Sequence, residues 1–267
     1  MSLSVVLITQ NEETNLGRTL ESVLPLVGNG KVGDGTGEIL IVDSGSTDRT
    51  LEIAMSFGAK VFHEPWKGFA AQKNSALEKA SCNWVLQLDA DEALEPELCR
   101  ELQELLASGP ALAGFFIPRK NFFLGRWIRH GGFYPDPKLR LIRRGAGKFE
   151  EYGAHPTIKL NDGLKAGAVK HALLHNAYPT LRGYIDHMNS YSSMGAMVAV
   201  ERGHRSFSLL DIVIRPWLTF LYNYVFRLGF LDGREGLLLH LYHAVYVSWK
   251  YAKAWELART KSGASLP

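Results

Sequence analysis

Apolar and polar residues alternate with two different periods along the first part of the chain. Short and nearly continuous apolar runs predict buried strands over residues 3–8, 38–42, 60–63 and 84–88. Amphipathic spacing between these runs predicts helices over about 13–27, 47–57 and 70–80, with a Gly-rich loop over 27–37. Because strands that alternate with helices form a mostly parallel sheet with helices on both faces, we expect an α/β fold.

The pattern changes after residue 114. The strands predicted in this part cover 114–119, 138–144 and one stretch within 165–175, with a Gly/Pro-rich turn over 131–137. Beyond Pro179 the apolar spacing becomes helical and predicts helices near 181–202, 208–229 and 234–260. We therefore expect a sheet-containing domain over 1–178 and a helical extension over 179–267.

The helical extension is both basic and apolar, although the net charge of the whole chain is only +3. In the last quarter of the chain, from residue 202 on, the basic residues are Arg202, Arg205, Arg215, Arg227, Arg234, Lys250, Lys253, Arg259 and Lys261, against the acidic residues Asp211, Asp232, Glu235 and Glu256. This combination favours binding to an anionic membrane surface, with Trp217, Tyr222 and Trp249 at the level of the lipid headgroups. The stretch is too apolar for a solvated phosphate-binding face, so nucleic acid is not an expected partner.

Two further features bear on location. The longest apolar candidate, PWLTFLYNYVFRLGFL, is interrupted by Arg227, which favours an interfacial helix over a membrane-spanning one. The first apolar run is typical of a strand rather than a signal peptide, and Cys82 with Cys99 makes neither a disulfide framework nor a Cys/His metal site. We therefore expect a cytoplasmic protein, peripheral on the inner face of the cytoplasmic membrane.

Polar side chains follow three of the predicted strands. These residues are Thr9, Gln10, Asn11 and Glu12 after the first strand, Asp43 and Ser44 after the second, and Asp89 and Asp91 after the fourth. The ligand of a parallel α/β sheet lies beyond the carboxyl ends of its strands, so we expect these residues to converge on one site. Structural alternatives are a helix start at Asp89 and Asp91, a turn bonded to Asp43, and a capping box from Thr9 and Glu12.

Several segments resemble those of a known family. They are LITQNEETNLGRTLESV, ILIVDSGSTDRTLEIA, GFAAQKNSALEKA and LQLDADEALEPEL. Together they resemble the inverting glycosyltransferases of family 2, which have the GT-A fold. FFLGRWIRHGGFYPDPKLRLIRRG and RLGFLDGREGLLLH narrow the resemblance to the lipopolysaccharide-core β-glucosyltransferases that act on heptose or Kdo. The resemblance implies that residues 1–110 bind the nucleotide-sugar and residues 111–178 the acceptor.

The resemblance also implies a UDP-sugar donor, with glucose as the sugar, and a divalent metal ion, Mg²⁺ or Mn²⁺. Asp91 is then the more direct metal ligand, and Asp89 contacts the ribose or the metal. The metal and the donor phosphates would relieve the repulsion between these two carboxylates. The resemblance further implies nucleoside contacts from Thr9, Asn11, Glu12, Asp43 and Ser44, and a diphosphate contact from Lys73, for which a solvated helix lysine is the alternative.

An inverting transfer needs a base that removes the proton of the acceptor hydroxyl. Related enzymes commonly carry a His-Glu pair after the strand that ends in RLIRR, whereas this chain reads GAHPT, with Pro156 in place of the glutamate. Asp136 is our first choice as the base, with a turn aspartate as its structural alternative. Glu151 and His155 are the reserve candidates.

Aromatic residues near 122–134, interleaved with Arg126, Arg129 and His130, predict a platform for an anionic acceptor, or else part of the core. The expected function is transfer of a sugar from a UDP-sugar to a lipid-linked core oligosaccharide. One alternative is transfer to a polyprenyl phosphate or to another surface glycan. A second is a non-catalytic membrane protein that binds nucleotide-sugar and has lost its base, as Pro156 would suggest.

Overall fold

The computed structural model describes residues 2–28, 37–150 and 156–261. Glu151, His155 and most of the predicted Gly-rich loop lie outside the described residues. The described chain forms two compact units. The first contains residues 2–28, 37–119, 136–150 and 156–175, and the second contains 120–135 and 176–261.

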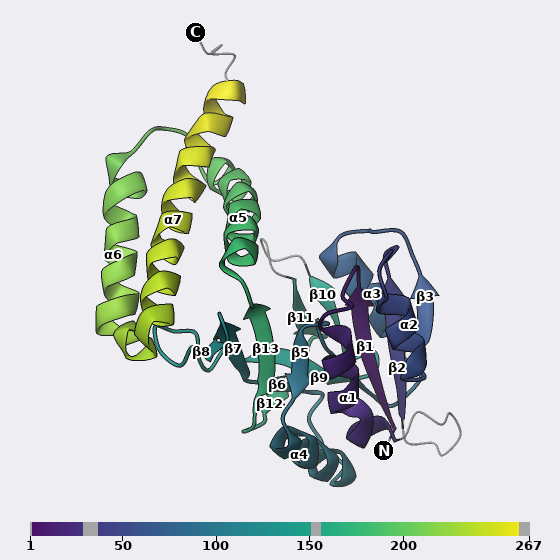
Figure 1. The fold of residues 1–267 in the computed structure, drawn as a ribbon. Coiled ribbons are helices and arrows are strands. Elements are labelled where there is room, and N and C mark those ends of the chain that lie inside the picture. The colour runs from purple at the N-terminus through teal and green to yellow at the C-terminus, as the bar shows by residue number, and fades with distance from the viewer. Residues whose placement is uncertain (1, 29–36, 151–155, 262–267) are drawn as a thin grey trace. The chain divides into compact units, whose positions relative to one another are not determined.

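A seven-stranded sheet forms the centre of the first unit, in the order β12-β6-β9-β4-β1-β2-β3 (Figure 1). Its members are β1 (Leu3–Thr9), β2 (Gly37–Asp43), β3 (Lys60–His63), β4 (Trp84–Gln87), β6 (Gly114–Ile117), β9 (Lys138–Arg143) and β12 (Ala166–Ala168). Strands β4, β1, β2 and β3 run parallel, and β9 is antiparallel to both β4 and β6. The predicted mostly parallel sheet is therefore confirmed.

Helices cover both faces of this sheet, so the side chains on both sides of β1 are buried. Leu3, Val5 and Leu7 pack against apolar residues of α1 (Leu16–Val27), α2 (Thr50–Ser56) and α4 (Pro96–Ala107). Val6 points to the other face and packs with α3 (Phe69–Glu78) and with the hairpin of β10 (Gly147–Glu150) and β11 (Thr157–Leu160). A strand buried on both faces is a nearly continuous apolar run, as LSVVLI is.

Some elements of this unit differ from the expectation. The stretch 165–175 was expected to form one strand, but it contains β12 and the start of a separate strand, β13 (Leu173–Tyr178). β13 pairs antiparallel with the short strand β5 (Glu92–Leu94), which places His175 opposite Glu92. The expectations also omitted α4, although Leu98, Leu102 and Leu106 recur at helical spacing and are buried.

The second unit is mainly helical. Its elements are β7 (Arg119–Phe123), β8 (Arg126–Trp127), α5 (Leu181–Glu201), the π-helical η1 (Leu210–Ile214), α6 (Arg215–Leu221), the π-helical η2 (Tyr222–Phe226), the 3₁₀-helical η3 (Gly229–Asp232) and α7 (Gly233–Lys261). α7 packs against both α5 and α6, as Figure 1 shows. The helices predicted near 181–202, 208–229 and 234–260 are confirmed. In the described part of the chain, no helix combines the length and the apolar character needed to cross a membrane.

Candidate functional site

The polar residues that follow β1, β2 and β4 come together, because these three strands are neighbours in the sheet. Thr9 and Asp43 stand opposite each other at the ends of β1 and β2. The backbone N–H of Leu88, directly after β4, donates to the carbonyl of Val6 in β1. The predicted convergence of the strand ends is therefore observed, and all of the candidates described below lie in the first unit.

The Asp43 carboxylate organises the loop after β2. It accepts hydrogen bonds from the hydroxyl of Thr9 (2.8 Å), from the backbone N–H groups of Gly45 (2.9 Å) and Ser46 (2.8 Å), and from the Ser46 hydroxyl (2.5 Å). Burial alone would raise the pKa of Asp43, but these donors hold it below its ordinary value. A carboxylate has about four lone-pair positions, so a nucleoside contact from Asp43 would replace one of these bonds.

Asn11 joins the loops that follow β1 and β2. Its backbone N–H donates to the Ser46 hydroxyl (2.9 Å), and its side-chain oxygen accepts from the backbone N–H of Thr47 (2.9 Å). Its φ of 56° lies in the left-handed region, which asparagine tolerates better than most residues. Ser44 is tied to the same edge through its backbone N–H, which donates to the carbonyl of Thr9 (3.0 Å).

The Glu12 carboxylate lies near enough to Asp89 and Asp91 to be repelled by their negative charges. Its backbone N–H donates to the Thr50 hydroxyl (2.7 Å), and one carboxylate oxygen accepts from the Asn15 side chain (3.1 Å). Burial raises the pKa of Glu12; the Asn15 bond opposes this, and the negative charges of Asp91 and Asp89 add to it. The alternative of a capping box is not seen, because no side chain caps α1.

Helix α1 holds the turn that contains Asp89 and Asp91. The Thr19 hydroxyl donates to the carbonyl of Ala90 (2.6 Å), and Arg18 donates to the carbonyl of Asp91 (3.2 Å). The backbone N–H of Asp89 donates to Glu92 (3.0 Å), which closes the turn on itself. The two aspartates therefore lie on a turn that side chains of α1 hold in place, and they do not begin a helix.

Positive side chains lie directly on Asp89. Lys73 Nζ is 2.6 Å from one carboxylate oxygen, and Arg140 Nη2 is 2.6 Å from the other. Although burial opposes it, these two cations hold the pKa of Asp89 well below its usual range. The expectation assigned relief of the carboxylate repulsion to a metal and phosphates alone, but side chains from α3 and β9 provide much of it.

Arg140 also bridges to Glu92, and both side chains are almost fully buried, at 4% and 0% exposure. Arg140 Nη2 lies 2.6 Å from Glu92, and Nη1 donates to the side-chain oxygen of Gln87. A second arginine, Arg119, places Nη1 3.0 Å from the same glutamate. Glu92 is therefore a buried carboxylate that two arginines share.

Asp136, the first-choice base, lies at the end of this row of alternating charges. Arg119 reaches its Oδ2 through Nε (3.1 Å) and Nη2 (2.5 Å), and Lys138 Nζ lies 2.9 Å from its Oδ1. Burial alone would raise the pKa of Asp136, but the two cations lower it to about 2. The carboxylate is thus ionised at neutral pH and is a weak proton acceptor while both cations remain in place.

Asp91 has a different partner. His175 Nε2 lies 3.4 Å from its Oδ2. Burial and the nearby charge of Asp89 would raise the pKa of Asp91, but the contact with His175 and a backbone hydrogen bond together lower it. The described residues contain no group of three or more His, Cys, Asp or Glu side chains suited to hold a metal ion. Asp91 and His175, which contact each other, are nevertheless both of residue types that bind metal ions in proteins.

The sequence reasoning did not find His175, Arg119, Arg140 or a role for Glu92. Arg140 alternates with the buried Leu139 and Leu141 in KLRLIRR, a spacing that indicates a side chain on one defined face of a strand. An arginine within a buried strand is nearly always paired, so Arg140 could have predicted a buried carboxylate partner.

The sequence matches the family model "Glycosyl transferase family 2" over residues 4–166. The chain belongs to this family. It is similar to the lipopolysaccharide core biosynthesis glycosyltransferase LpsC of Rhizobium meliloti, with 33% identity over 263 residues, 96% of this chain and 93% of LpsC. An uncharacterized glycosyltransferase of Rickettsia typhi is 27% identical over 266 residues, 96% of this chain and 87% of its own length.

Among solved structures, the family 2 chain resembles TarS of S. aureus, determined in complex with UDP-GlcNAc. The TM-score is 0.51 at 14% sequence identity, and the match covers 100% of this chain and 93% of the TarS chain. At this level of identity the likeness concerns the fold, and it confirms the GT-A expectation.

Proposed function

We propose that this family 2 glycosyltransferase transfers a sugar from a UDP-sugar to an acceptor in the core region of lipopolysaccharide, with inversion at the sugar carbon. The observation that carries the proposal is the gathering of Asp43, Asp89 and Asp91 with Lys73 and Arg140 at the carboxyl edge of the sheet. The similarity to LpsC over nearly the whole chain supports the acceptor class. The complex of TarS with UDP-GlcNAc, in the same fold, supports the donor class.

The nucleoside is assigned to the loops after β1 and β2, with contacts from Thr9, Asn11, Glu12, Asp43 and Ser44. Hydrogen bonds through Asn11 and Ser46 hold those loops together without a donor, which supports the assignment. Lys73 and Arg140 are assigned to the donor diphosphate, which would compete with Asp89 for their positive charges.

The donor set of the site fits a divalent metal ion. Mg²⁺ is usually held by one or two carboxylates together with substrate phosphates rather than by a cage of protein ligands. Asp91 and His175 would hold the ion, and Asp89 would join them or contact the ribose. When bound, Mg²⁺ or Mn²⁺ stabilises the negative charge that develops on the departing diphosphate.

In the proposed reaction an acceptor hydroxyl oxygen forms the bond to the sugar carbon as the bond to the UDP oxygen breaks, and a base takes the hydroxyl proton. Asp136 is the base that we assign among the described residues. For Asp136 to accept the proton near neutral pH, Arg119 and Lys138 would turn from it toward an anionic substrate. Glu151 and His155 stay as reserve candidates.

We also infer that the second unit docks on an anionic membrane surface through an apolar stripe. We give this name to the exposed residues Leu209, Leu210, Val213, Ile214, Trp217, Leu218, Tyr222, Val225 and Phe226. They recur every four residues, in pairs except at Tyr222, and a four-residue repeat drifts about 40° around the axis of an α-helix at each step. The π-helical η1 and η2 have more residues per turn, so they offset this drift and support a straight stripe.

The charges around the stripe favour an anionic partner over a second copy of the chain. Between residues 202 and 231 the acidic side chain is Asp211, which pairs with Arg215 (2.8 Å), whereas Arg202, Arg205 and Arg227 are exposed. Two copies joined through this face would bring like charges together, whereas each arginine near an anionic leaflet adds about 1 kcal/mol of attraction.

A donor panel tests the proposal. Calorimetric titration with UDP-glucose, other UDP-sugars and GDP-sugars, each with Mn²⁺ and with EDTA, should give metal-dependent binding to at least one UDP-sugar. Equal binding of UDP- and GDP-sugars, or no binding to either, would refute the donor assignment.

A further inference from the structure

The two segments that narrowed the family resemblance pack on each other within the second unit. Asp232 is buried, and its carboxylate accepts hydrogen bonds from the backbone N–H groups of Arg129 (3.1 Å) and His130 (2.8 Å). It also lies 2.9 Å from Nδ1 of His130. A buried carboxylate satisfied by main-chain donors fixes the backbone that supplies them. The segment after β8 is therefore held in one position by the corner before α7.

Glycine makes this close packing possible. A Cβ on Gly131 would lie 1.9 Å from the buried His240 ring, and its φ of +64° already lies in the left-handed region. The Gly131 N–H donates to the carbonyl of Arg227 (2.9 Å). The packing therefore determines where the neighbouring side chains of Trp127, Arg129 and Tyr134 are presented.

Those side chains form a cluster with two cations on one aromatic ring. Arg129 Cζ lies 4.2 Å from the centroid of the Trp127 ring, and Lys120 Nζ lies 4.8 Å from it. Tyr134 and the same indole form a T-shaped pair, with ring centroids 5.2 Å apart. The cluster thus combines positive charge with a flat apolar surface.

Two further facts concern its hydrogen-bond donors. Trp127 Nε1 is buried and has no hydrogen-bond partner among the described residues. No acidic side chain in the described ranges pairs with the exposed Arg129 guanidinium, whereas Arg126 lies 3.8 Å from Glu235. Of the three basic residues expected on this platform, His130 is used by Asp232 and Arg126 faces Glu235, which leaves Arg129 for a ligand.

We propose that Lys120, Trp127, Arg129 and Tyr134 bind a sugar that carries an anionic group, a carboxylate or a phosphate. The guanidinium, the ammonium and the indole N–H would donate to the anionic oxygens, and the aromatic rings would contact the apolar face of the sugar. This inference rests on the proposed function, since it makes the acceptor of that transfer an acidic or phosphorylated sugar. It gives the second unit a recognition site of its own.

The indole N–H of Trp127 allows a direct test on the full-length protein. Two-dimensional ¹⁵N NMR resolves the tryptophan indole signals, and Trp127→Phe identifies the signal of Trp127. Titration with glucose 6-phosphate and with glucuronate should shift that signal, and titration with glucose should not. A shift with only one of the two anions supports the site and names the anionic group. A shift of equal size with glucose, or no shift with either anion, would overturn the proposal.

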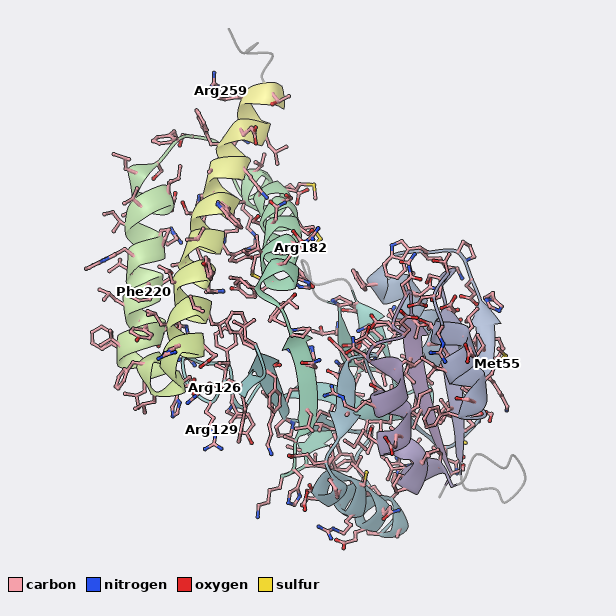
Figure 2. The ribbon with its side chains drawn as sticks, viewed as in Figure 1. Met55, Arg126, Arg129, Arg182, Phe220 and Arg259 are labelled. Atoms are coloured by element: carbon pink, nitrogen blue, oxygen red, sulfur yellow. The ribbon has the colours of Figure 1, made fainter. Side chains whose placement is uncertain are left out.

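Two exposed arginines near each other in the sequence provide a matched pair of variants (Figure 2). Arg129→Gln removes a charge-assisted hydrogen bond, so we expect the affinity for the shifting anion to fall about tenfold or more. Arg126→Gln should leave it unchanged. Equal effects of the two variants would indicate general surface charge and contradict a built site.

Kinetics separate this inference from the proposed function. In a transfer assay Arg129→Gln should raise the KM for an anionic acceptor and leave the KM for the donor unchanged. If the protein transfers no sugar from any donor, the proposed function fails, whereas the NMR titration still decides whether the anion site exists. An unchanged acceptor KM in an active enzyme would contradict the acceptor role.

Discussion

Replacing Arg140 by methionine should destabilise the first unit strongly. The change keeps an unbranched side chain but removes the guanidinium that lies 2.6 Å from both Asp89 and Glu92. Removing one partner of a buried ion pair typically costs about 3–5 kcal/mol, because the remaining charge is left uncompensated. Here Lys73 still contacts Asp89 and Arg119 still contacts Glu92, so we expect about 3 kcal/mol.

The loss should depend on pH in a defined direction. Asp89 has a lowered pKa in the folded protein, so its contribution to stability is present above its unfolded pKa of about 3.9 and is lost as the pH falls toward its folded value. The variant lacks most of this contribution. The difference in stability between wild type and variant should therefore be largest near neutral pH and shrink below about pH 4.

Urea denaturation followed by circular dichroism at pH 7 and at pH 3.5 measures both effects. Arg100→Met is the matched control, because Arg100 pairs with Glu97 on the surface and both side chains are at least half exposed. Such a pair contributes about 0–1 kcal/mol. A loss in Arg140→Met no larger than in the control, or one that grows at low pH, would refute the reasoning about the buried charges.

Other perturbations give equally definite expectations. Asp136→Asn should lower kcat by about 10²–10⁴ with little change in UDP affinity, whereas Asp162→Asn, on an exposed turn, should not; an active Asp136→Asn would direct the search to Glu151→Gln and His155→Ala. Because the pKa of Asp136 is about 2 in the free protein, the pH profile of kcat/KM, which reports the free enzyme, should show no acidic limb from this residue between pH 5 and 8. In vesicle co-sedimentation the full chain should bind anionic vesicles at low salt and release them at high salt. Replacing both Trp217 and Phe226 by serine should weaken binding by about tenfold or more, whereas Met55→Ser, an exposed apolar residue of the first unit (Figure 2), should not. Protein that stays in the supernatant with anionic vesicles at low salt would exclude membrane docking.

Local patterns were enough to predict the strands and the position of the site edge. A strand at LSVVLI and a loop after it can be predicted from consecutive residues alone. Parallel strands then bring their carboxyl ends, and the polar residues that follow them, to one edge of the sheet. The partners of the carboxylates depend on contacts between distant residues. Arg140 is separated from Asp89 by 51 positions, and no local period shows whether its face of β9 meets water or acid.

His175 illustrates the same limit. It reaches Asp91 because β13 pairs with β5, a strand of 3 residues whose short length gives almost no periodic signal. Asp232 is more than a hundred positions from Arg129 and His130, whose backbone N–H groups it accepts from. The family resemblance included both segments, but it did not predict that they are in contact. The basic and apolar composition predicted a membrane-facing stretch around Trp217 and Tyr222, but the π-helical turns that support a straight apolar stripe have no signal in residue propensity.

The most direct test of the account is transfer itself, measured as UDP released from a UDP-sugar in the presence of lipopolysaccharide-core acceptor. Asp91→Asn preserves the shape of the side chain and removes its charge. Several kcal/mol of stabilisation of the leaving diphosphate would then be lost, which corresponds to a fall in turnover of at least about a hundredfold. We predict rapid release by wild-type protein with Mn²⁺, little with EDTA, and little by a folded Asp91→Asn variant. Undiminished release in EDTA and by Asp91→Asn would contradict the account.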